Sequence, residues 1–192
     1  MKQKREANKP KKTETAMRIA KLIEEYIADQ GWDNDTVNRD EEEGTSQLKT
    51  TMSINNQNFR LYIEGDEKRE LLSLYLYAPF SVIEGKSVDA CLLFNYLNDR
   101  FTYRGRITVQ DDGDIRYVEI IDVENIEPPI AMIDNMLNSG IGMFRSNIES
   151  IAAVALTQKT YEAIRADYDK KDAARELHNQ KEEENASTES EE

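Results

Sequence analysis

The chain has 192 residues, a formal net charge of −13 at pH 7 and an apolar content of 39%, with the apolar residues concentrated in its middle. The negative charge argues against a nucleic-acid binder and against binding to an anionic membrane, because both need clustered Lys and Arg. The basic start of the chain lacks the apolar core of a signal peptide, and no run of about 18 apolar residues occurs, so we expect a cytoplasmic protein.

The two ends of the chain differ in composition from the middle. Residues 1–12 are rich in Lys and Arg and carry almost no apolar side chain, which predicts a disordered basic arm. Residues 171–192 are highly charged and end in glutamates, which predicts a charged, largely disordered acidic tail. We therefore expect residues 13–170 to form a single domain.

The first half of this domain predicts one helix followed by strands. Apolar residues recur at helical spacing over residues 14–30, and Gly31 follows where a helix would end. Residues 34–44 are polar and predict a loop. Three runs typical of strands follow at residues 48–54, 59–63 and 71–78, and Asn55-Asn56 predicts a hairpin turn between the first two.

The second half predicts a helix, a hairpin and a long helix. Residues 87–101 form an apolar helix, and the turn Asp111-Asp112-Gly113-Asp114 separates two runs of alternating apolar residues. Apolar residues at steps of three and four predict a long helix over residues 130–155, in which two glycines at residues 139–142 mark a bend or close packing. The order α-β-β-β-α-β-β-α predicts an α+β fold with one mostly antiparallel five-stranded sheet packed on helices.

The stretch LLFNYLNDRFTYRGRITVQDDGDIRYVEIIDVE, between LYLYAPFSVIEGK and MIDNMLNSGIGMF, resembles the YbjN family of bacterial sensory transduction regulators. The resemblance covers residues 15–156 and rests on Asn95-x-x-Asn98 before Asp112-Gly113-x-Ile115-Arg116-Tyr117. It implies a fold similar to type III secretion chaperones, a cytoplasmic homodimer and a non-enzymatic regulatory or chaperone-like role. Ile83 stands where family members usually carry proline, and the family has no catalytic residues to transfer.

Catalytic and metal sites find little support in the sequence. The chain has one histidine, His178, in the charged tail and one cysteine, Cys91, so neither a zinc site nor a Cys-His or Ser-His-Asp arrangement is expected. If Gly113 were the glycine of a calcium loop, Thr108 and Gln110 would stand at the first ligand positions, so we favour a plain hairpin turn. We expect no catalytic residues, no metal and no cofactor.

The helix at residues 87–101 is apolar on nearly all sides, so it must be buried on two sides, by a large core or by a second subunit. In a chain of this length we favour the second subunit, because a small domain has few elements to spare as a second cover. The residues expected at the resulting homodimer interface are Val88, Cys91, Leu92 and Tyr96.

Strand alternation turns another set of side chains away from the core. With Phe59 and Leu61 facing inward, Arg60 faces outward, whereas in the third strand either the tyrosines or the leucines face that way. Arg and Tyr give strong contacts at low ordering cost, so this surface suits a peptide with acidic and aromatic groups, unless the terminal helix or the acidic tail covers it. The candidate protein-binding residues are Arg60, Tyr62, Tyr75, Tyr77, Arg106 and Arg116.

These features favour a non-enzymatic, chaperone-like adaptor or regulator that binds an unidentified protein or peptide segment as a homodimer. The alternative is a small-molecule sensor or enzyme with a pocket between the sheet and the long helix, lined by Tyr75, Tyr77, Arg104 or Asp122. Direct DNA binding ranks third, because only the arm at residues 1–12 is basic.

Overall fold

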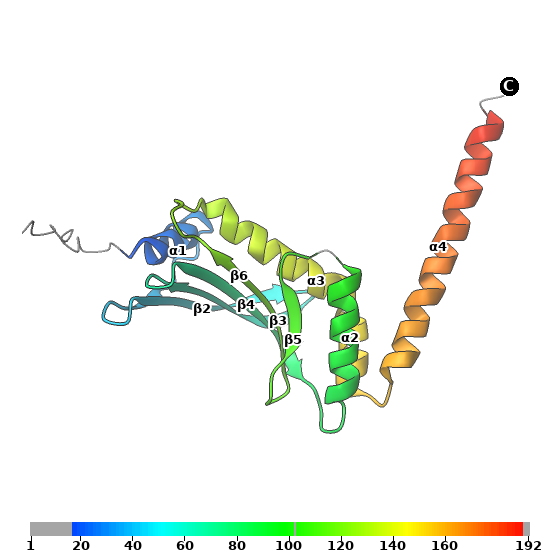
Figure 1. Ribbon diagram of the computed structural model, residues 1–192, viewed down its shortest axis with the longest axis horizontal. Helices are drawn as coiled ribbons and strands as arrows, with labels where there is room; N and C mark the ends of the chain where they lie inside the picture. Colours follow the sequence, from blue (N-terminus) through cyan, green and yellow to red (C-terminus); the bar gives the residue numbers. More distant parts are fainter. Residues whose placement is uncertain (1–16, 102, 190–192) are drawn as a thin grey trace, which may run out of the picture.

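The computed structural model describes residues 17–101 and 103–189, with the side chains described up to residue 180. Within these ranges the chain has an α+β fold of four helices and six strands (Figure 1). The elements are α1 (Arg18–Asp29), β1 (Val37–Asp40), β2 (Thr45–Ile54), β3 (Gln57–Asp66), β4 (Leu71–Ser81), α2 (Ser87–Arg100), β5 (Arg106–Val109), β6 (Asp114–Asp122), α3 (Ile130–Leu156) and α4 (Tyr161–Glu189).

The strands form one antiparallel sheet in the order β1-β2-β3-β4-β6-β5, which confirms the predicted α+β class. Two hairpin turns predicted from the sequence are confirmed. Asn55 and Asn56 join β2 to β3 with φ angles of 51° and 61°, and Gly113 has a φ of 86° in the turn between β5 and β6. These left-handed conformations are the ones that Asn and Gly adopt at the lowest steric cost.

The strand β1 corrects two predictions, the loop at residues 34–44 and the count of five strands. It pairs with β2 at the edge of the sheet, with Val37 opposite Leu48. Of its four residues only Val37 is even partly buried, so the strand carries no alternation of apolar and polar side chains. Such short, polar strands are common at sheet edges, where they discourage pairing with other chains.

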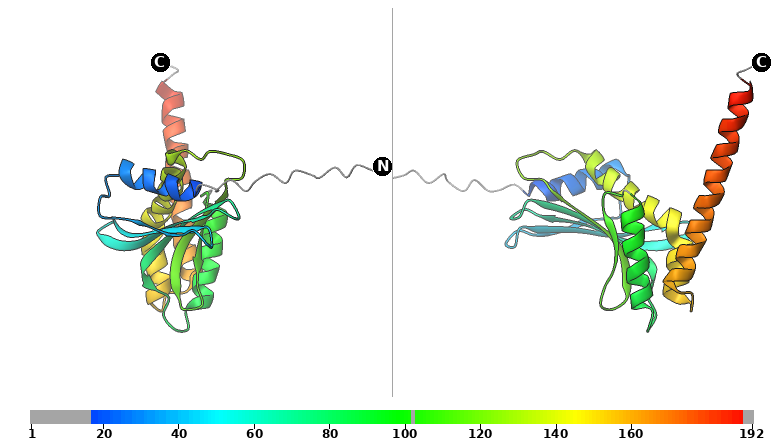
Figure 2. Two further views of the ribbon diagram at one scale, coloured as in Figure 1. Left: turned by 90° about the vertical axis from the view of Figure 1, so that its left-hand side faces the viewer. Right: turned by 45° about the vertical axis from the view of Figure 1, so that its right-hand side comes forward.

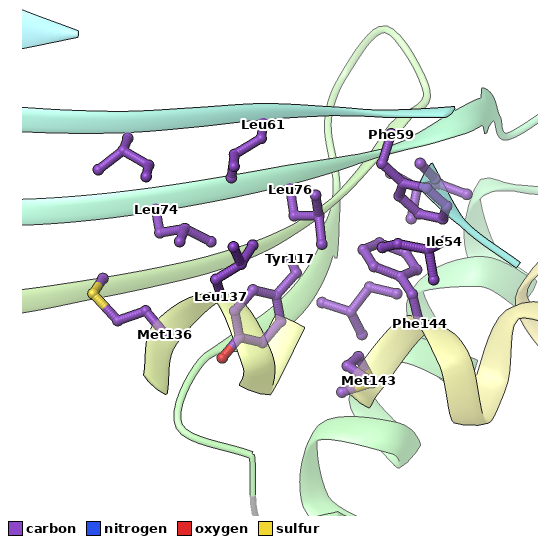
Figure 3. Packing of buried hydrophobic residues seen from close by; sticks show 14 of the residues in the cluster. Ile54, Phe59, Leu61, Leu74, Leu76, Tyr117, Met136, Leu137, Met143 and Phe144 are labelled. Atoms are coloured by element: carbon purple, nitrogen blue, oxygen red, sulfur yellow. The ribbon is translucent and has the colours of Figure 1, made fainter. Parts of the chain in front are cut away.

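Helices α1 and α3 cover one face of the sheet, and α2 packs against β5 and α3 (Figures 1 and 2). In β4, Leu72, Leu74 and Leu76 are fully buried in this core. The sequence left open whether the leucines or the tyrosines of this strand face outward, and the structure turns the leucines inward. Tyr75 and Tyr77 therefore lie on the other face. The core side chains between the sheet and α3 include Leu61, Leu74, Leu76, Tyr117, Met136, Leu137 and Phe144 (Figure 3).

Helix α3 runs without a break through both of its glycines. A Cβ atom at Gly140 would lie 2.8 Å from Cδ1 of Tyr117, so the missing side chain leaves room for the tyrosine ring against the helix. At Gly142 the nearest atom to a Cβ would be Cε1 of Tyr103, at an ordinary contact distance of 3.6 Å. Close packing, and not a bend, therefore explains Gly140.

The side chain of Asn98 on α2 closes the β5 edge of the sheet. Its amide nitrogen donates to the carbonyl oxygen of Ile107 at 3.0 Å, and its amide oxygen accepts the Ile107 N–H at 2.9 Å. These two hydrogen bonds occupy backbone groups that an edge strand would otherwise present to other chains. The helix α2 thus covers one edge of the sheet as well as part of the core.

Helix α4 continues to Glu189, whereas the sequence predicted a largely disordered tail at residues 171–192. Its residues include many good helix formers, and Arg165 pairs with Asp169 one turn later at 3.0 Å. Figure 1 shows α4 leaving the body of the domain, and the helix packs against α2 and α3.

None of the described helices is both long and apolar enough to span a membrane. The predicted basic arm at residues 1–12 lies outside the described residues.

Candidate functional site

The face of the sheet opposite α1 and α3 is not covered by any described helix (Figures 1 and 2). We call it the open face. The sequence allowed the terminal helix to cover it, but α4 packs on α2 and α3. Solvent reaches side chains on this face, as Ile120 on β6 shows with an exposed fraction of 51%.

Strand register places all six predicted binding residues on the open face and brings five of them together. Tyr77 on β4 stands opposite Arg60 on β3 and opposite Arg116 on β6. In the next row Tyr62 stands opposite Tyr75. The five side chains come from three adjacent strands in the middle of the sheet, so the backbone ladder fixes their relative positions.

The two arginines of this cluster stack on its tyrosine rings. The guanidinium carbon of Arg60 lies 4.9 Å from the centroid of the Tyr77 ring, and that of Arg116 lies 5.0 Å from the Tyr75 centroid. The rings of Tyr62 and Tyr77 meet edge to face, with centroids 5.5 Å apart. Cation–π contacts of this kind hold an arginine in place without neutralising its charge.

Arg60 already has a carboxylate partner. Its Nη2 lies 2.5 Å from Oδ2 of Asp114, whose Oδ1 accepts a hydrogen bond from the Ser81 hydroxyl at 2.7 Å. The Ser81 hydrogen bond and then the Arg60 hydrogen bond hold the pKa of Asp114 below its ordinary value. Asp114 is therefore ionised at neutral pH and compensates the charge of Arg60.

Arg116 is different, because it forms no ion pair with the described residues. Its Nη1 donates to the Tyr77 hydroxyl at 3.2 Å, and its buried Nε finds no acceptor among the described residues. Directly opposite on β5, the Thr108 hydroxyl is also buried without a partner. A half-buried guanidinium with unused donors is suited to binding a carboxylate, because charge-assisted hydrogen bonds are the stronger ones.

The cluster borders a hollow of about 380 Å³, which adjoins a second hollow of about 460 Å³ on the same face. Gln47, Glu64 and Tyr75 line both, so the two form one continuous depression across the sheet. The second hollow carries carboxylates from Asp40, Glu64 and Asp66 together with Arg69. The sequence interpretation missed this acidic half, although alternation along β3 places Glu64 and Asp66 on the same face as Arg60.

The remaining predicted residues lie outside this depression. Arg106 is exposed on β5 and lines neither hollow. The small-molecule alternative needed a pocket between the sheet and the long helix, but that space is filled by the core in Figure 3, and Tyr75 and Tyr77 point to the opposite face. Arg104 and Asp122 are exposed to solvent. Tyr75, Tyr77, Arg104 and Asp122 are therefore not assembled around a common cavity.

The four residues predicted at a dimer interface divide into two groups. Tyr96 is 8% exposed, because α4 covers it: its ring meets the ring of Tyr168 at 5.5 Å, and the guanidinium of Arg165 lies 4.2 Å from its centroid. The second cover that α2 required is thus supplied in part by the same chain. Val88 and Leu92 remain 73% and 44% exposed. Cys91 is exposed as well.

Among the described residues, no group of three or more His, Cys, Asp or Glu side chains is placed to hold a metal ion. The open face combines charge, aromatic side chains and a depression.

No family model matches the chain, so the resemblance to the YbjN family is not confirmed, and no curated protein matches it either. Two solved structures are similar. One is the HopA1-SchA chaperone-effector complex, with a TM-score of 0.45 and 17% identity over 68% of this chain and 92% of that chain. The other is the ExsC-ExsE complex, with a TM-score of 0.44 and 15% identity over 70% of this chain and 96% of that chain. We infer function from the surfaces of the chain itself.

Proposed function

We propose that this protein is a non-enzymatic, chaperone-like adaptor or regulator that binds a segment of another protein on the open face of its sheet. The observation that carries the proposal is Arg116, a half-buried arginine that stacks on Tyr75 and has no ion pair within the described residues. The charge of Arg116 is not neutralised within the described residues and its Nε lacks an acceptor there, so a bound carboxylate would add charge-assisted hydrogen bonds.

The shape of the open face favours a protein segment over a small molecule. Small-molecule sites are normally concave clefts that bury most of the ligand. Here the depression crosses the sheet from Asn38 on β1 to Arg116 on β6, and it is lined by tyrosines, arginines and other polar side chains. Tyrosine and arginine are enriched at the energetic centres of protein interfaces, because they offer large contact areas at low cost in conformational entropy.

The proposal includes a homodimer, a cytoplasmic location and membership of the YbjN family. The dimer is supported by Val88, Cys91 and Leu92, which give α2 an exposed apolar surface beside the part that α4 covers. Exposed apolar surface of this kind is typical of subunit contacts. The two surfaces, on α2 and on the open face, come from different elements, so dimer formation would leave the open face accessible.

Affinity capture from a native bacterial lysate tests the binding proposal. The full-length chain is compared with the double variant Arg60→Glu/Arg116→Glu and with the control Lys21→Glu/Arg145→Glu, which makes the same change in net charge on exposed residues of α1 and α3. We expect a reproducible set of proteins that the unmodified chain and the control retain and that the open-face variant loses. An identical set for all three, or no reproducible set at all, would show that the open face does not bind protein.

A further inference from the structure

Charges on the open face are separated along the direction of the strands. On β3 the outward-facing side chains run in the order Arg60, Tyr62, Glu64, Asp66. Arg116 stands in the same row as Arg60, with Tyr77 between them, and Asp40 on β1 lines the hollow that contains Glu64 and Asp66. One end of the depression is therefore basic and the other acidic.

At the basic end, Arg116 supplies the charge that no neighbour compensates. The Arg60 guanidinium is matched by Asp114, as described above. Asp112 also borders this hollow, but it lies on the β5–β6 turn, where its carboxylate accepts the Asp114 N–H at 3.0 Å. A carboxylate entering the hollow would thus find the guanidinium of Arg116 between the rings of Tyr75 and Tyr77.

At the acidic end, two carboxylates have no cationic partner in the described part of the chain. Glu64 accepts a hydrogen bond from the Gln47 amide at 2.7 Å but forms no ion pair there, and neither does Asp40. The Oδ2 of Asp66 lies 3.9 Å from the Nε of Arg69, which is at the distance limit of an ion pair. A cationic side chain placed here would meet unneutralised negative charge.

The spacing of the two ends sets the length of a matching segment. Arg116 lies in the row of Arg60 but two strands away, roughly 10 Å at about 4.8 Å per strand, and Glu64 follows Arg60 by four residues, roughly 13 Å at about 3.3 Å per residue. An extended segment that runs obliquely from Arg116 to Glu64 therefore spans roughly 16 Å, or about five residues at the same rise per residue. Between the charged ends, Tyr62 and Tyr75 present aromatic surface, with Lys49 on β2 opposite Tyr62, and Ile120 adds apolar surface in the row of Glu64.

We infer that the open face selects an extended protein segment with an acidic residue and a basic residue about four to six positions apart and apolar or aromatic residues between them. The inference rests on the proposed function and names the chemical class of its partner. The acidic residue binds Arg116, and the basic residue binds Glu64. A purely acidic segment, such as the glutamate-rich end of this chain, is disfavoured because it would place negative charge on Glu64.

Selection from a random library of displayed twelve-residue peptides tests this inference with the biotinylated full-length protein. We expect enriched peptides to carry an acidic and a basic residue four to six positions apart, in one fixed order. Selection on Arg116→Gln should lose the acidic preference alone, and selection on Glu64→Gln should lose the basic preference alone. Because each variant removes one charge at one end, the two are matched controls for each other.

Affinities of one enriched peptide and its Glu→Gln counterpart complete the test. The unmodified protein should bind the counterpart at least tenfold more weakly, whereas Arg116→Gln should distinguish the two peptides by less than threefold. Enriched peptides without the charge pair, purely acidic peptides, or no enrichment over the Arg60→Glu/Arg116→Glu variant would overturn the inference. If the lysate partners are nevertheless lost on charge reversal, the proposed function stands and only the charge pattern is wrong.

Discussion

Arg100 on α2 and Asp172 on α4 form a bidentate ion pair, with Nη1–Oδ2 and Nη2–Oδ1 distances of 2.6 and 2.5 Å. The Arg100 guanidinium also stands 5.3 Å from the centroid of the Tyr168 ring. At the start of α4, the carboxylate of Asp89 accepts the Tyr161 N–H at 2.8 Å. These contacts fix the first turns of a charged helix on α2, and they decide which part of α2 stays exposed.

We predict that Asp172→Asn loosens the docking of α4 without changing the sheet. The substitution removes the charge of a partly exposed ion pair, so we expect a loss of up to about fivefold in hydrogen-exchange protection at residues 161–172. Asp169→Asn is the matched control, because the partner of Asp169 is Arg165 on the same helix. Equal losses in both variants would show that the pair with Arg100 does not hold α4 in place.

Acid should release α4. The Arg100 guanidinium lowers the pKa of Asp172, and Lys86, followed by the Tyr161 N–H, lowers that of Asp89. A carboxyl group with a lowered pKa in the docked state stabilises docking above its ordinary pKa of about 4, and this contribution is lost as the pH falls through the lowered value.

We therefore expect docking to be constant from pH 8 to pH 5 and to weaken below about pH 4. The measurement is hydrogen exchange over residues 161–172, corrected for the intrinsic effect of pH on exchange. In the variant Asp89→Asn/Asp172→Asn this acid-dependent step should be absent. A step of the same size in that variant would assign it to other carboxyl groups.

Substitution by alanine at the two glycines of α3 should change the stability of the protein in opposite directions. At Gly140 the new methyl group would meet the Tyr117 ring at 2.8 Å, so we expect Gly140→Ala to destabilise the protein by about 1 to 3 kcal/mol. At Gly142 the nearest atom would be 3.6 Å away, so the higher helix propensity of alanine should stabilise the fold by up to about 1 kcal/mol. Urea denaturation followed by circular dichroism measures both. A stabilising Gly140→Ala would contradict the close packing of Tyr117.

Periodicity predicted the parts of this fold in which apolar side chains alternate or recur. The strands β2, β3 and β4, the β5–β6 hairpin, α2 and α3 all carry such patterns, and the structure contains each of them. The strand β1 was missed because Val37 is the one apolar residue among its four, and pairing with β2 makes it a strand. The sequence did not predict the helical end of α4, because its charged residues leave no apolar pattern to recognise.

The candidate site was predictable to the extent that strand alternation determines a face. Alternation placed Arg60 and Tyr62 correctly, but it left open which side chains of β4 face outward, because tyrosines and leucines are both apolar enough to be buried. The acidic half depends partly on Asp40, which lies in the strand that was predicted as a loop. The cover of Tyr96 by α4 depends on a tertiary contact that no local pattern encodes.

The exposed part of α2 carries the prediction of a homodimer. At micromolar concentration we expect light scattering to report twice the chain mass of 22.1 kDa for the unmodified protein and a single mass for Val88→Asp/Leu92→Asp, because charged side chains would be desolvated in the interface. Leu177→Asp is the control, since Leu177 is an exposed leucine on α4. A monomeric mass for the unmodified chain would exclude the dimer at that concentration.

Arg116 and Tyr117 are neighbours on β6 that point to opposite faces, and they should differ sharply in their effects on stability. The buried Tyr117 hydroxyl donates to the carboxylate of Glu119 at 2.8 Å and accepts the Gly105 N–H at 2.7 Å. The Ser139 hydroxyl is a third hydrogen-bond partner, at 2.9 Å. Tyr117→Phe removes these hydrogen bonds and leaves buried polar groups with fewer partners, so we expect a loss of about 1 to 3 kcal/mol in the free energy of unfolding.

Arg116→Gln should change that free energy by less than about 1 kcal/mol, because loss of the Tyr77 hydrogen bond and of the contacts with the Tyr75 and Tyr77 rings is offset by removal of a buried Nε that lacks an acceptor in the described part of the chain. Urea denaturation of both variants under the same conditions makes the comparison. If Arg116 serves to bind a partner, its substitution should leave the free energy of unfolding nearly unchanged, whereas substitution of Tyr117 in the core should lower it. If Arg116→Gln cost as much as Tyr117→Phe, Arg116 would be a structural residue, and the open face would lose the observation that marks it as a binding surface.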